Sequence, residues 1–237
     1  MADEPSRFTE TRAFATQAAL IARNARRVEP PAAGRNVVVL VHGFLAAPPV
    51  FDPLRRRIAE DLGWASMAFG YASYGSFEAT AERFSRAVEQ HVPAASTLTL
   101  VGHSLGGLLA RWYVEELGGA QRVERVVTVS TPHQGTRVAR LAPFGLGASI
   151  LPGSAVIERL AGRRPGPALH ALAGADDGTV SQESALGCAA DTKAVIEGVG
   201  HNAILYAPHA QDALIAAIAG GAVDLGDHRR SVGSLAS

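Results

Sequence analysis

The sequence has a single cysteine, no excess of charge of either sign and no long apolar run. Each of these absences excludes a class of protein. Of 237 residues only Cys188 is a cysteine, so no disulfide can form within the chain. Basic and acidic residues number 22 each, which leaves no overall field that favours nucleic acid or an anionic membrane. The apolar run at 213–223 is too short to cross a bilayer, which takes about 20 residues.

Two further shortages bear on location and cofactors. Residues 1–12 lack the basic and then apolar stretch of a secretory signal, which together with the free cysteine predicts a cytoplasmic protein. No cluster of histidine, cysteine and carboxylate residues has the spacing of a metal site, so we expect no metal and no other cofactor. The mixed charge is compatible with a monomer that has no nucleic-acid partner.

From residue 36 onward the chain alternates between apolar runs and helical segments. Six short β-branched or apolar runs are predicted as strands, at 36–42, 64–71, 97–103, 125–131, 168–174 and 193–200. Helical spacing between them is clearest at 76–92 and 105–117. Continuous apolar strands suit a sheet with helices on both faces, so we predict an α/β fold with a mainly parallel sheet of about six strands.

Three other parts of the chain differ from this pattern. Residues 1–35 are predicted to form a leading helix over 6–27 and a linker, and 220–237 a frayed tail, which leaves 36–219 as the main domain. Within it, the long apolar interval 132–167 exceeds an ordinary connection and is expected to be a lid or a pocket wall. A crossover helix with long loops explains this interval equally well.

A serine between glycines stands where the third predicted strand ends. The run Gly102-His103-Ser104-Leu105-Gly106 matches G-x-S-x-G and lies between a predicted strand and a predicted helix, the context that this motif needs. In such a turn the serine has strained backbone angles, and the glycines remove Cβ atoms that would clash. Ser104 is therefore the candidate nucleophile at the carboxyl edge of the sheet. A Gly-Ser turn without chemistry is the alternative.

A serine hydroxyl is a poor nucleophile without a base and a group that orients the base. Both follow in the order that the motif predicts, because Asp177 comes after the strand at 168–174 and His201 after the strand at 193–200. We expect His201 to be the base and Asp177 to orient it. The neighbouring Asp176 is a rival for the second role.

Two backbone N–H groups are expected to stabilise a developing oxyanion. One belongs to Leu105, directly after the serine, and the other to Phe44, where Gly43 permits a sharp turn after the first strand. His42 is expected to anchor this loop, and His103 to support the serine turn.

The other histidines have weaker claims to a role. His133 follows the strand at 125–131, and a place in the pocket and a structural place are equally compatible with its position. Surface or packing positions are expected for His91, His170, His209 and His228.

Five segments, in order, resemble those of α/β-hydrolases, and more narrowly of the bacterial lipase and esterase group. They are "VVVLVHGF", "LVGHSLGGLLARWYVEEL", "VVTVSTPHQGT", "DGTV" and "VIEGVGHNAILY". The last is similar to that of compact lipases with six-stranded sheets. The resemblance implies Ser104, His201 and Asp177 as catalytic residues and the same two oxyanion donors. It favours Asp177 over Asp176, because the segment of that group that resembles "DGTV" has its aspartate three residues before a valine, as Asp177 is before Val180.

The function expected from these residues is that of a serine hydrolase, a lipase or esterase, that cleaves carboxylic esters through an acyl-enzyme. Medium-chain or lipid-like esters are the expected substrates, with His133, Phe144 and Leu146 as candidate pocket residues, and transient contact with a lipid surface is compatible with this. An acyltransferase or a thioesterase would use the same three residues. A non-catalytic binding relative would be marked by the loss of one of them.

Overall fold

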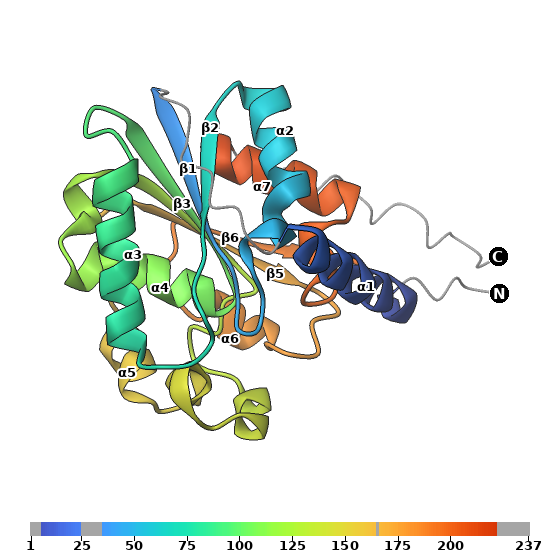
Figure 1. The fold of residues 1–237 in the computed structure, drawn as a ribbon. Coiled ribbons are helices and arrows are strands. Elements are labelled where there is room, and N and C mark those ends of the chain that lie inside the picture. Colours follow the sequence, from blue (N-terminus) through green and yellow to red (C-terminus); the bar gives the residue numbers. More distant parts are fainter. Residues whose placement is uncertain (1–5, 25–34, 165, 222–237) are drawn as a thin grey trace, which may run out of the picture.

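The computed structural model describes residues 6–24, 35–164 and 166–221 and contains a six-stranded parallel sheet (Figure 1). The strand order is β2-β1-β3-β4-β5-β6, and every neighbouring pair is parallel. The strands are β1 (Asn36–Val41), β2 (Ala65–Phe69), β3 (Thr97–His103), β4 (Val123–Val129), β5 (Ala168–Gly174) and β6 (Thr192–Ile196). The predicted α/β fold is confirmed, and the carboxyl ends of all strands meet at one edge.

Helices cover both faces of the sheet, as the apolar strands predict (Figure 1). One face carries α3 (Phe77–His91), α4 (Leu105–Glu116) and α5 (Ala155–Leu160). The other carries α2 (Asp52–Leu62) and α7 (Pro208–Ala219), while the short α6 (Gln182–Leu186) connects β5 and β6. The sheet divides the core into two apolar clusters, and residues 37–41 of β1 are fully buried between them.

The helix α3 shows how the sequence pattern sets local structure. Its apolar residues Phe77, Ala81, Phe84 and Val88 recur three or four positions apart and are all buried against the sheet. The helix begins after Ser76, whose side-chain oxygen accepts a hydrogen bond from the N–H of Ala79 at 3.2 Å. Both features can be read from the sequence, because helical spacing and capping of a helix start each relate residues only three or four positions apart.

The strand ends differ most from the sequence prediction at the last strand. It stops at Ile196 instead of residue 200, because a turn with Gly198 in the left-handed region (φ 68°) follows it. The leading helix α1 (Ser6–Asn24) is present. The expected linker and most of the expected tail lie outside the described residues, and the limits 36–219 of the main domain stay a prediction.

The interval 132–167 divides into two parts. The 3-10 turns η3 (Arg137–Leu141) and η4 (Gly145–Ile150) lie at the carboxyl edge of the sheet, whereas α5 packs its Val156, Ile157 and Leu160 into the core beside α4. Arg111 of α4, only 1% exposed, donates to the carbonyl oxygen of Leu160 at 2.9 Å and pairs with Glu115 at 2.8 Å. A buried arginine with these partners holds the second part against the body of the domain.

The helix α1 packs at the same edge of the sheet. It contacts the 3-10 turns η1 (Pro48–Phe51) and η5 (Ala203–Leu205), and Ala13 is the α1 residue that enters the core. The neighbouring Phe14 is 62% exposed. Across the described ranges, no helix combines the length and apolar character that crossing a membrane requires.

Candidate active site

The serine turn has the strained geometry that its motif predicts. Ser104 follows β3 with φ 53° and ψ −125°, a conformation that non-glycine residues rarely adopt. A Cβ on Gly106 would lie 2.0 Å from the carbonyl oxygen of Val41, and one on Gly102 would lie 2.4 Å from Cα of Gly107. Only glycine permits this approach of the turn to β1, and the serine is left at the wall of a pocket.

The loops after β5 and β6 bring an aspartate and a histidine together. His201 Nδ1 and Asp177 Oδ2 are 2.8 Å apart, and Asp177 Oδ1 accepts hydrogen bonds from the N–H groups of Thr179 and Val180, both at 2.8 Å. Burial opposes ionisation of Asp177, but the hydrogen bonds from His201 and from these two N–H groups outweigh it and lower the pKa. An ionised Asp177 accepts a hydrogen bond from Nδ1–H of His201, which leaves the lone pair of Nε2 to take up a proton.

Asp176 takes a different position from its neighbour. Its side chain is exposed, and its backbone N–H donates to the carbonyl oxygen of Val199 at 3.0 Å. The structure therefore places Asp177, and not Asp176, against His201.

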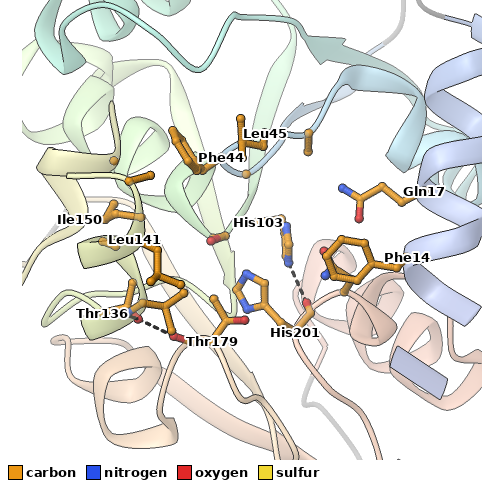
Figure 2. A pocket seen from close by; sticks show the side chains of 18 residues that line it. Phe14, Gln17, Phe44, Leu45, His103, Thr136, Leu141, Ile150, Thr179 and His201 are labelled. Carbon is orange, nitrogen blue, oxygen red and sulfur yellow. Dashed lines mark hydrogen bonds between the residues drawn. The ribbon is translucent and has the colours of Figure 1, made fainter. Parts of the chain in front are cut away.

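His103 ties the serine turn to the loop that carries His201. Its Nε2 donates to the carbonyl oxygen of His201 at 2.8 Å, the dashed contact between these labelled residues in Figure 2. Burial lowers the pKa of His103 to about 3, so the ring is neutral. Among the described residues its Nδ1 has no hydrogen-bond partner. The ring thus fixes the position of the neighbouring loop.

His42 holds the loop after β1 in a similar way. Its Nε2 accepts the N–H of Tyr71 at 3.3 Å, its ring stacks on that of Tyr71 at a centroid distance of 4.1 Å, and the Tyr71 hydroxyl donates to the His42 carbonyl at 2.6 Å. Burial lowers the pKa of His42 to about 4. The neutral ring carries its proton on Nδ1 and donates to the carbonyl oxygen of Gly43 at 2.8 Å.

The two expected oxyanion donors lie beside the serine. A Cβ on Gly43 would stand 3.0 Å from Cβ of Ser104, so the loop after β1 packs directly on the nucleophile candidate. Within the described part of the chain, the N–H groups of Phe44 and Leu105 have no acceptor. Both remain available to a ligand oxygen.

A cavity of about 430 Å³ opens at this edge of the sheet and contains both Ser104 and His201 in its wall. Phe14 and Gln17 of α1 lie on one side of it, and Phe44, Leu141 and Ile150 on the opposite side (Figure 2). Its size falls within the usual range for small-molecule sites, and most of its lining is apolar. Across the described ranges, no three histidine, cysteine, aspartate or glutamate side chains gather as a metal site would require.

The three expected pocket residues do not line this cavity, and the expectation is corrected. His133 lies behind it, where its Nδ1 accepts from Arg111 at 3.0 Å and its Nε2 donates to Thr128 Oγ1 at 3.1 Å. Burial, followed by the charge of Arg111, lowers the pKa of His133. Leu146 points into the core, and Phe144 is exposed outside the lining. The residues of 132–167 that do line the cavity are Thr136, Val138, Ala139, Leu141, Ala142, Gly147 and Ile150.

The contribution of α1 was not predicted from the sequence. Glu10 accepts hydrogen bonds from the backbone N–H groups of Asn202 at 2.9 Å and Ala203 at 3.1 Å, and from Asn202 Nδ2 at 2.9 Å. A Cβ on Gly200 would lie 2.6 Å from Glu10 Oε2, so the glycine makes room for the carboxylate. Glu10 on one side and His103 on the other therefore hold the loop of His201.

Replacing Glu10 by alanine should lower kcat about 10-fold, while KM for a short ester should change little. The loop that carries His201 would lose the carboxylate that accepts its backbone hydrogen bonds, and the imidazole ring would be misplaced. Steady-state kinetics against pH would measure this, with Glu10→Gln, which keeps one acceptor oxygen, expected to restore part of kcat. Glu82→Ala, at an exposed carboxylate on α3, is the matched control. An unchanged kcat in Glu10→Ala would show that the contact does not position the ring.

A parallel sheet with a strained serine turn after β3 and an Asp–His pair at the same edge defines the class of α/β-hydrolases. A family model described as palmitoyl protein thioesterase matches residues 37–161, just over half of the chain, and the chain belongs to this family. It is accordingly a hydrolase of the lipase, esterase and thioesterase kind. A search of curated protein sequences found no match.

Solved structures support the same fold. The mature lipase BlEst2 from Bacillus licheniformis is 17% identical with a TM-score of 0.58, over 76% of this chain and 90% of that one. The alpha/beta hydrolase domain-containing protein 10 from mouse is 16% identical with a TM-score of 0.59, over 82% of this chain and 95% of that one. At 16% and 17% identity, the similarity to these structures shows a shared fold only.

Proposed function

We propose that the protein cleaves carboxylic esters of apolar acyl groups, with Ser104 as nucleophile, His201 as general base and Asp177 as the group that orients it. The observation that carries the proposal is the 2.8 Å contact between His201 Nδ1 and Asp177, made at the wall of the cavity that also contains the strained Ser104. A base that a carboxylate orients, in the wall of the same cavity as a serine hydroxyl, is the arrangement that acyl transfer requires.

The proposed reaction has two halves. His201 Nε2 takes the proton of Ser104 Oγ as the oxygen attacks the carbonyl carbon, and the N–H groups of Phe44 and Leu105 bind the resulting oxyanion. His201 then returns the proton to the leaving alcohol, and water releases the acid by the same route. Among the described residues Ser104 Oγ makes no hydrogen bond to His201, and such bonds are often long until substrate binds.

The apolar wall formed by 136–150 supports an acyl group as the part of the substrate that enters the cavity. We propose that this first part of the interval 132–167 is the acyl wall, and that α5 is its support. That this wall also moves as a lid is a further prediction. The carbonyl would then lie between Ser104 and the two backbone donors, at the polar end of the cavity.

A thioester of the same acyl group is the second candidate substrate. The family match favours it, because the matching model is described as palmitoyl protein thioesterase. The proposed steps apply unchanged, with a thiolate in place of the alcohol as leaving group.

The substrate class can be tested with p-nitrophenyl esters of increasing acyl length and with thioesters of the same acids. For esters we expect kcat/KM to rise about fourfold per methylene until the cavity is filled, since each buried methylene is worth about 0.8 kcal/mol. Ala142→Trp should move the preferred length to shorter chains, because Ala142 lines the cavity.

Three outcomes would change the proposal. A rate that does not depend on acyl length would contradict the acyl wall, and a strong preference for thioesters at equal chain length would select the second candidate. Transfer of the acyl group to an added alcohol in preference to water would indicate an acyltransferase.

A further inference from the structure

All six large apolar side chains that are exposed in the described part of the chain surround the mouth of the cavity. Their exposed fractions run from 42% to 86%, although large apolar side chains on a soluble surface normally occur singly. We call this set the apolar rim; it consists of Phe14, Leu45, Tyr74, Val138, Leu141 and Phe144.

The rim is assembled from four separate segments of the chain. Phe14, Leu45, Val138 and Leu141 line the opening itself. The other two lie on adjoining loops, because a Cβ on Gly145, next to Phe144, would stand 3.5 Å from Cα of Tyr74. The rim is therefore one continuous surface around the cavity, and no local sequence pattern explains why it is apolar.

Apart from Glu10, the charged residues of these segments are cations. Residues 36–51 and 64–77 contain no lysine, arginine, aspartate or glutamate, and 126–157 contain only Arg137 and Arg140. Both arginines are exposed on η3, on either side of Val138 and next to Leu141. The single carboxylate of α1, Glu10, is turned away onto the loop of His201. Although the whole chain is neutral, the rim presents cations without acidic neighbours in its own segments.

We propose that the apolar rim docks on the surface of a lipid bilayer that contains anionic phospholipids. The apolar side chains enter the boundary of headgroups and acyl chains, and Arg137 and Arg140 contact the phosphates. Docking turns the mouth of the cavity toward the membrane, so an acyl group can enter without passing through water. The proposal does not depend on hydrolysis, since none of these contacts involves Ser104.

The test is flotation of the full chain with vesicles of phosphatidylcholine alone and vesicles that also contain phosphatidylglycerol. The unchanged protein should bind the anionic vesicles more tightly. Arg137→Gln with Arg140→Gln should weaken that binding about 25-fold, at about fivefold for each arginine, and should abolish the preference. Tyr74→Ser with Phe144→Ser should weaken binding to both vesicles.

Two controls separate docking from folding and from catalysis. Arg83→Gln with Arg86→Gln makes the same charge change on the exposed face of α3 and should bind like the unchanged protein. Ser104→Ala should bind fully, so a failure of the proposed function leaves this result intact. A thermal unfolding curve that matches that of the unchanged protein should show that the arginine variants are folded.

Equal binding by the rim variants and the α3 control would overturn the proposal, as would equal affinity for both kinds of vesicle. A dimer that Tyr74→Ser with Phe144→Ser dissociates, in a protein that does not bind vesicles, would assign the rim to a second copy of the chain instead.

Discussion

Replacing Ser104 by alanine should lower kcat for ester hydrolysis about 10⁴-fold or more, with little change in KM. The change removes only Oγ, so the backbone of the turn and the cavity wall keep their structure, and the residual rate comes from the oxyanion donors and from binding. Stopped-flow or steady-state assays with a p-nitrophenyl ester would measure the loss.

Ser130 offers a matched control for this substitution. It directly follows the neighbouring strand β4 and has a positive φ of 46°, and among the described residues its buried hydroxyl has no hydrogen-bond partner. Ser130→Ala should therefore leave kcat within about twofold, because no polar contact is lost. Equal losses in the two variants would mean that the effect on Ser104 is structural and not chemical.

Replacing Asp177 by asparagine should lower kcat about 10⁴-fold, because the amide no longer holds the tautomer of His201 that has Nδ1 protonated. The geometry of the loop should persist, since the remaining carbonyl oxygen can still accept from Thr179 and Val180. The same assays would measure this loss, and a thermal unfolding curve would confirm that the variant is folded.

Asp176→Asn is the natural comparison for that experiment. Its side chain is exposed and does not contact His201, so we expect an activity within about twofold of the unchanged protein. If Asp176→Asn loses activity and Asp177→Asn keeps it, the orienting group has been assigned to the wrong neighbour.

The parts of the fold that could be predicted from the sequence depend on local patterns. Apolar runs and helical spacing located six strands and the helices at 76–92 and 105–117, because burial on both faces leaves a continuous signal in each element. The turn at Ser104 was also predictable, since its backbone strain requires glycine at fixed neighbouring positions. A topological rule about strand ends predicted an aspartate beside His201, and the resemblance to α/β-hydrolases favoured Asp177 over Asp176 for that place.

The rest depends on contacts between residues far apart in the chain. Nothing near Glu10 indicates that its carboxylate meets the backbone of Asn202, nearly two hundred positions later. The direction of each side chain in 132–167 is likewise set by tertiary packing, which turns Leu146 inward and exposes Phe144. Hydrophobicity alone predicts that such residues are near a pocket or a core, but not which of the two.

The central claim is that Ser104 carries the acyl group during turnover. Its most direct test is mass spectrometry of protein quenched during hydrolysis of p-nitrophenyl octanoate. We expect one octanoyl group per chain on the peptide that contains Ser104, and no such group in Ser104→Ala. Turnover with no acylated peptide, or with the acyl group on another residue, would contradict it.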